Sequence, residues 1–208
     1  MKRNTKAGSR TSVTASARVV SVAMSVAMAM AVTFLLGLAS LGLSASAHAQ
    51  KPAWEVFLPK ADEVGTGQFR WWGFLVYDAS LWAPIGQYKP GGPFALSLRY
   101  AREISRADIV DASIDQMRDL GLPIERHPEW RQKLNQVMAS VKPGDTLTGV
   151  YTPGQGAVFF HNDQLTGQVD ERLARAFFAI WLDPKTSEPE LRQALLGETA
   201  TQTAGGAQ

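Results

Sequence analysis

The chain has 208 residues, with 21 Lys and Arg against 19 Asp and Glu, and it contains no cysteine. The lack of cysteine excludes a disulfide framework, a thiol nucleophile and a lipidated cysteine, so stability must come from a hydrophobic core. Five of the basic residues and none of the acidic ones precede residue 50, so the rest of the chain carries 16 basic and 19 acidic side chains. This slightly acidic balance argues against nucleic acid as a partner.

Residues 1–49 have the pattern of a secretory signal peptide. Basic residues come first, the region 19–43 is apolar and rich in small residues, and an Ala-His-Ala cleavage site ends at Ala49. We therefore expect cleavage after Ala49, export to the periplasm, and a mature protein that begins at Gln50 and has no stable membrane span. The apolar region is longer than in most signal peptides, so an uncleaved membrane anchor is the alternative.

The predicted domain, residues 50–197, opens with strands. Residues 54–58 alternate and stop at a proline, which predicts a short edge strand. Residues 65–82 are rich in aromatic and β-branched side chains and predict two strand segments that pivot near Gly73, apolar enough for a central strand. Residues 94–100 alternate and predict a further strand.

Two helices are predicted next. Ser105 and Asp108 fit a capping box, and the apolar residues that follow at helical spacing predict a helix that ends before Gly121. A second helix is predicted after Glu129, with an apolar stripe that continues to Val141.

The chain then returns to strands and finishes in two more helices. Three short strands with tight turns between them are predicted over residues 147–169, as an antiparallel meander. Asp170 is the predicted cap of one helix, and a capping box at 187–190 predicts another that ends at Gly197. This order predicts an α+β fold with an antiparallel sheet and helices on one face, followed by a disordered tail at 198–208.

Few residues of the predicted domain suggest chemistry. The sequence holds no GxSxG motif, no phosphate loop and no metal-spaced histidine cluster, so we expect no metal and no cofactor. Arg70 and Tyr77 are polar groups inside an apolar run, and a buried guanidinium needs a carboxylate, a carbonyl or a ligand as its partner. Asp78 is the nearest acid, so Arg70 is either half of a structural ion pair or a ligand anchor. The aromatic residues around Trp72 fit either a core or the wall of a cleft.

Four segments resemble the bacterial chalcone isomerase-like proteins. They are GxxRxWGFLVYDASLW, ISRADIV, KPGDTLTGVYTPGQGAVFF and AFFAIWLDPKTSEPELRQALLG, and the resemblance spans residues 54–197 in order. It implies an open-faced β-sandwich, in which a layer of helices covers one face of a large antiparallel sheet. It also implies a ligand cleft between the two layers.

The resemblance implies roles for individual residues. Arg70 is similar in position to an arginine that faces the cleft in the plant members, and Tyr77 to a tyrosine of the fatty-acid-binding relatives. The isomerases have a threonine there, and they use a tyrosine and an asparagine on the first helix and a small polar residue on a later one. The matching parts of this chain offer Asp108, Asp115 and Ala179, which we take with Trp72 as candidate cleft residues. Flavanone-forming catalysis is therefore not expected.

Three functions follow from these observations. The expected one is a non-catalytic binding protein for a lipophilic carboxylate such as a fatty acid, clamped by Arg70 and Tyr77. The alternatives are an isomerase-type intramolecular lyase, in which Arg70 stabilises an oxyanion, and an envelope structural or partner module with a filled core.

Overall fold

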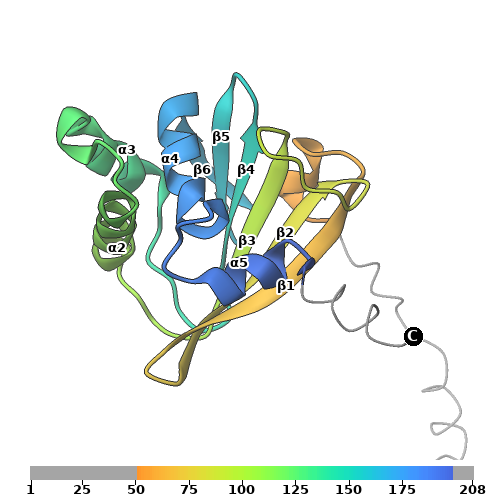
Figure 1. The fold of residues 1–208 in the computed structure, drawn as a ribbon, viewed down its shortest axis with the longest axis horizontal. Helices are drawn as coiled ribbons and strands as arrows, with labels where there is room; N and C mark the ends of the chain where they lie inside the picture. Colours follow the sequence, from red (N-terminus) through yellow and green to blue (C-terminus); the bar gives the residue numbers. More distant parts are fainter. Residues whose placement is uncertain (1–50, 199–208) are drawn as a thin grey trace, which may run out of the picture. The chain divides into compact units, whose positions relative to one another are not determined.

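A computed structural model describes residues 51–198, and its centre is one six-stranded antiparallel sheet (Figure 1). The strands lie side by side in chain order: β1 (Ala61–Trp71), β2 (Phe74–Pro84), β3 (Phe94–Tyr100), β4 (Thr146–Thr152), β5 (Gly156–His161) and β6 (Gln164–Val169). The expected leader, its cleavage site and the tail from residue 199 lie outside the described residues. Within the described part, no helix is both long enough and apolar enough to cross a membrane.

The helices form a layer on one face of this sheet. They are α2 (Arg106–Asp119), η2 (Ile124–Arg126), α3 (Glu129–Val137), α4 (Glu171–Leu182) and α5 (Pro189–Leu195). The 3₁₀ helix η1 (Ala53–Val56) lies against the opposite face of the sheet, where its Trp54 packs with Ala95 and Val150. Helix α5 packs on β1, α4 on β5 and α3 on β6, while α2 packs against α3 and α4. The predicted α+β class, with a large antiparallel sheet and one helical layer, is confirmed.

Two predicted helix caps are present as side-chain hydrogen bonds. The Ser105 hydroxyl accepts from the Asp108 backbone N–H at 3.1 Å, at the start of α2. One carboxylate oxygen of Asp170 accepts from the Arg172 and Leu173 backbone N–H groups, both at 3.1 Å, at the start of α4. These caps satisfy N–H groups that have no partner within the helix, and they fix where α2 and α4 begin over the sheet.

Helix α5 lies directly on β1 because the strand carries glycine beneath it. A Cβ atom on Gly65 would lie 2.2 Å from the Ala194 carbonyl oxygen, and one on Gly67 would lie 2.7 Å from Leu191 Cδ1. Any larger side chain at Gly65 would therefore push the helix off the strand. The two glycines fix the position of α5 and of the chain segment that enters it.

The predicted strand at 54–58 is instead the 3₁₀ helix η1, so that prediction was wrong. Trp54 and Leu58 are four residues apart, and both are buried in a small cluster with Ala95, Val150 and Phe160. In a strand, Val56 would share a face with Trp54 and Leu58, but its side chain is 80% exposed, so the chain coils here and does not extend along the sheet.

Two predicted helix ends also differ. Helix α3 stops at Val137 instead of Val141, because Val141 forms an isolated antiparallel bridge with Ile104. The residue that caps α5 is Glu188, without a side-chain cap bond, and the Ser187 hydroxyl donates to Gln116 at 2.9 Å. In both cases a contact with a distant segment outweighs the local signal.

Candidate functional site

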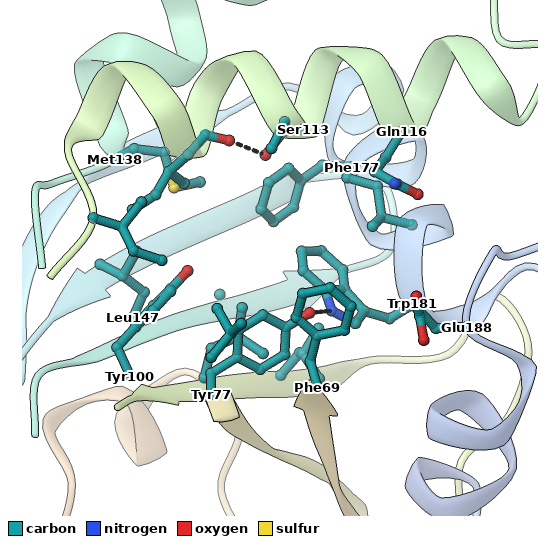
Figure 2. A pocket seen from close by; sticks show the side chains of 18 of the residues that line it. Phe69, Tyr77, Tyr100, Ser113, Gln116, Met138, Leu147, Phe177, Trp181 and Glu188 are labelled. Carbon is teal, nitrogen blue, oxygen red and sulfur yellow. Dashed lines mark hydrogen bonds between the residues drawn. The ribbon is translucent and has the colours of Figure 1, made fainter. Parts of the chain in front are cut away.

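A cavity of about 290 Å³ lies between the sheet and the helices α2 and α4 (Figure 2). Side chains from five strands form its floor, with Phe69, Tyr77 and Tyr100 among them. Its roof comes mainly from α2 and α4, including Phe177 and Trp181. Most of the lining is aliphatic or aromatic, as is usual for sites that bind small lipophilic molecules.

Two tyrosines place hydroxyl groups in this cavity. The Tyr77 hydroxyl accepts from the Trp181 indole N–H at 3.0 Å, and the Tyr77 ring stacks on Phe69 with centroids 5.1 Å apart. Burial raises the pKa of the Tyr77 hydroxyl, and it outweighs the opposite effect of the Trp181 hydrogen bond. The phenol therefore keeps its proton and can donate it to a ligand while it accepts from Trp181.

The Tyr100 hydroxyl is the free polar group of the cavity. The residue is only 5% exposed, its ring packs edge-on against Tyr77, and its hydroxyl makes no hydrogen bond to a described residue. Burial, with a smaller effect of Tyr77, raises its pKa, so it too is a neutral donor. Every fully enclosed side-chain nitrogen or oxygen among the described residues has a partner, so this hydroxyl must border the cavity space.

Helix α2 adds polar groups to the roof. Ser113 is buried, but its hydroxyl is already committed to the Ile109 carbonyl at 2.7 Å. Gln116 is half-buried and accepts from the Ser187 hydroxyl, which leaves its amide N–H₂ free to donate.

One end of the cavity is acidic. Glu188, in the connection between α4 and α5, lines the cavity beside Gln116 (Figure 2). Burial, and to a lesser degree the charge of Glu190, raises the pKa of the Glu188 carboxyl. The residues that line this cavity, all of them in the described part, include no lysine, arginine or histidine. An anionic group inside would meet hydroxyls and a carboxylate but no cation.

The opening of the cavity is marked by the lining residues that are solvent-exposed. These are Trp71 at the end of β1, Asp108 and Ala112 on α2, and Ser187 in the α4–α5 connection. A ligand would therefore enter between the end of the β1–β2 hairpin and the helical layer.

Arg70 lies outside this site, and the expectation of a buried guanidinium was wrong. The residue is exposed, and its guanidinium donates to the Gln68 side-chain oxygen at 2.9 Å and to the Gly73 carbonyl at 3.2 Å. It makes no ion pair with Asp78, whose carboxylate accepts from the Gln68 amide. Successive strand residues point to opposite faces, so Arg70 lies on the face away from Phe69 and the cavity.

A one-residue bulge explains why Arg70 and Tyr77 are separated. Arg70 pairs with Leu75, but its neighbour Phe69 pairs with Tyr77, so Val76 is an extra residue in β2. In a regular ladder Val76 would pair with Phe69 and Tyr77 with Gln68, so Tyr77 would share a face with Arg70. The extra residue turns Tyr77 to the helix-covered face, because a one-residue slip reverses the facing of a strand.

The remaining candidate residues are dispersed. Asp108 lines the opening of the cavity, where its carboxylate accepts from the Ser105 hydroxyl at 2.7 Å. Asp115 is exposed and pairs with Arg118 at 2.6 Å, and Trp72 lies exposed in the β1–β2 turn. Ala179 lines a different hollow, beside Tyr88 and Arg175. Of the residues expected at the cleft, Tyr77 and Asp108 are thus the two that line it.

Several residues that line the cavity were not predicted. Tyr100 ends a strand that alternation identifies correctly, and its place on the apolar face was a usable signal. Trp181 lies on the apolar side of α4, and only its indole N–H, which donates to the Tyr77 hydroxyl, distinguishes it from a core residue. Glu188 falls within the capping box predicted at 187–190, a pattern that does not indicate a cavity. Among the described residues, no group of three or more acidic or histidine side chains is arranged to hold a metal ion.

Comparisons with known proteins agree with this architecture. The family described as chalcone isomerase-like matches residues 65–197, which is more than half of the chain. Among solved structures, the chain is similar to the fatty-acid binding protein AtFAP1 of Arabidopsis thaliana, with a TM-score of 0.54 and 13% sequence identity over 69% of this chain and 90% of that chain. At this identity the likeness shows the fold alone, and a comparison with curated proteins finds no match. The chain belongs to the chalcone isomerase-like family.

Proposed function

We propose that the protein binds a lipophilic small molecule in the cavity between the sheet and the helices α2 and α4. The observation that carries this proposal is the cavity itself, which is largely apolar and bordered by the unpaired Tyr100 hydroxyl. A cavity that served only as core would gain stability by being filled, and it would not need a hydroxyl without a protein partner. The Arabidopsis neighbour is a fatty-acid binding protein, which supports the same ligand class.

The head group of the ligand is best supported as an uncharged one. A lipophilic carboxylate such as a fatty acid fits the apolar walls, but the lining offers its ionised head no cation and places Glu188 nearby. Burying an unpaired charge is strongly unfavourable. We therefore propose that the ligand is held as a neutral molecule, either a protonated acid or a lipid with a hydroxyl or carbonyl head. Tyr100, Tyr77 and Gln116 would donate hydrogen bonds to that head.

A matched pair of ligands tests this proposal. Dodecanol and dodecanoate have the same chain, and at mildly alkaline pH they differ in the charge of the head. We expect dodecanol to displace a neutral fluorescent polyene alcohol at a concentration at least about tenfold lower than dodecanoate does, since stranding a charge costs at least about 1–3 kcal/mol. Equal or tighter binding of dodecanoate would show that a cation reaches the head group. Displacement by neither ligand would contradict the binding function itself.

We also propose that the chain acts outside the cytoplasm as an exported protein. The support is the basic and apolar leader with its cleavage site at Ala49. A periplasmic binding protein for a lipophilic molecule would act beside two membranes, which are the source and the destination of such ligands.

A further inference from the structure

The turn between β1 and β2 holds a large aromatic residue in an unfavourable backbone conformation. Trp72 and Gly73 form a two-residue hairpin loop with φ angles of 52° and 79°. Such a loop needs two residues with positive φ, and asparagine or aspartate followed by glycine is the usual choice. Tryptophan in this region is strained, and strain of this kind points to a role for the side chain.

The side chains around this turn are apolar and face solvent. Trp71, Trp72 and Phe74, which we call the aromatic tip, are 60%, 84% and 66% exposed. Figure 1 shows that the β1–β2 hairpin carries them beyond the rest of the sheet. Exposed tryptophan at the end of a projecting hairpin adds little to the free energy of folding. We therefore expect the side chain to contact another molecule.

Positive charge flanks the aromatic tip. Arg70 donates to the Gly73 carbonyl at 3.2 Å, and the Arg102 guanidinium lies over the Phe74 ring at 5.7 Å. No acidic residue occurs between residues 69 and 75. The tip therefore presents tryptophan and phenylalanine with two arginines behind them.

We propose that the aromatic tip inserts into the interfacial region of a lipid bilayer, with Arg70 and Arg102 against the head-group phosphates. Tryptophan favours the boundary between acyl chains and head groups, and arginine beside it matches anionic lipids. A convex, projecting tip penetrates a soft surface, whereas a protein partner would need a matching concavity. This also accounts for Arg70, which has no place in the cavity.

The bilayer contact would bring the cavity to the membrane. Trp71 belongs to the tip and also lines the cavity opening. With the tip inserted, a lipophilic ligand would pass between bilayer and cavity with little exposure to water. This consequence rests on the proposed function, while the membrane contact does not.

Sedimentation with vesicles tests the contact. The chain from Gln50 onward contains all of the described residues 51–198 and lacks the apolar leader. It would be mixed with vesicles of phosphatidylcholine alone and of phosphatidylcholine with phosphatidylglycerol. The test variant is Trp72→Asn with Phe74→Thr, because Asn-Gly suits this turn and should preserve the hairpin.

A matched control is available at the other end of β2. Ile85 is 68% exposed, has φ of 54° and precedes Gly86, whose φ is 64°. Ile85→Asn thus removes an exposed apolar side chain from a similar backbone position, away from the aromatic tip. Both variants should sediment at the wild-type position without vesicles.

We expect the tip variant to lose at least tenfold in vesicle partitioning, while Ile85→Asn matches the wild type. Arg70→Gln and Arg102→Gln should each lower binding to the phosphatidylglycerol vesicles about fivefold, with little effect on pure phosphatidylcholine. Unchanged partitioning of the tip variant would overturn the proposal. A second outcome would also overturn it: the wild type forms a dimer and does not bind vesicles, and the tip variant is monomeric. The aromatic tip would then contact a second copy of the chain instead of a bilayer. Vesicle binding without dodecanol binding would retain this proposal and refute the proposed function.

Discussion

The Tyr100 hydroxyl allows ligand binding to be separated from folding. It borders the cavity and has no partner among the described residues, so Tyr100→Phe removes no protein contact. We expect the ligand-free variant to be as stable as the wild type, or more stable by up to about 1 kcal/mol, since a poorly solvated polar group is removed. Affinity for dodecanol should fall about two- to tenfold, which corresponds to one neutral hydrogen bond of about 0.5–1.5 kcal/mol.

The neighbouring tyrosine should show the opposite stability effect. Tyr77→Phe strands the indole N–H of Trp181, which donates to the Tyr77 hydroxyl at 3.0 Å, so the ligand-free protein should lose about 1–3 kcal/mol. Tyr151→Phe is the control, because that hydroxyl donates to Glu171 at 2.6 Å and Tyr151 does not line the cavity. It should lower stability without changing dodecanol affinity.

Guanidinium unfolding of ligand-stripped protein and dodecanol displacement, measured on the same preparations, give both quantities for all three variants. A loss of stability in Tyr100→Phe as large as in Tyr77→Phe would refute the reasoning, because the hydroxyl would then have a protein partner. Unchanged dodecanol affinity in Tyr100→Phe would exclude a ligand hydrogen bond at this position.

Three further predictions concern charge, catalysis and processing. Burial raises the pKa of Glu188 above its ordinary value of 4.5, so its contribution to stability is complete below the unfolded pKa and is lost as pH rises through the folded pKa. Glu188→Gln should therefore gain in unfolding midpoint relative to the wild type as pH rises through that window, and a constant difference would contradict this. We expect no cyclisation of a chalcone above the spontaneous rate, because the tyrosine and asparagine of the isomerases are missing. Turnover that Arg70→Ala abolishes would prove this wrong. The intact mass of protein from the periplasm should correspond to a chain beginning at Gln50 or its pyroglutamate, and a full-length species held in the membrane would contradict cleavage.

The strands and helices could be predicted from sequence wherever the signal was local. The alternation over β3, the two caps at Ser105 and Asp170, and the turns of the meander each depend on a few adjacent residues, and each is present. The end of α3 could not be predicted, because Val141 leaves the helical stripe to pair with Ile104, 37 positions earlier in the chain.

The prediction that Arg70 and Tyr77 form one site was wrong because of a single β-bulge. Arg70 and Tyr77 would share a face in a regular hairpin closed by Trp72 and Gly73, and the extra Val76 in β2 places them on opposite faces. The Val76 carbonyl accepts from the Ala101 N–H at 2.9 Å, which ties the bulge to the segment after β3. The hydrophobic pattern of the sequence does not reveal such a bulge, because Leu75 and Val76 are both apolar and can lie on either face of the strand.

The residues on the helix-facing side of β1 change from glycine to large aromatic residues along the strand. This change determines where α5 contacts the strand and where the cavity lies. Gly65 and Gly67 allow α5 to lie on the strand itself, which places the α4–α5 connection and Glu188 at one end of the cavity. Phe69 and Trp71 continue the same face with large rings that line the cavity. The helical layer is thus in close contact with β1 at its glycine end, and the cavity lies beside its aromatic end. Trp71 is also exposed at the aromatic tip. The same face of β1 therefore contacts α5 at its glycine end and borders the cavity opening at the end where, in our proposal, the bilayer would supply the ligand.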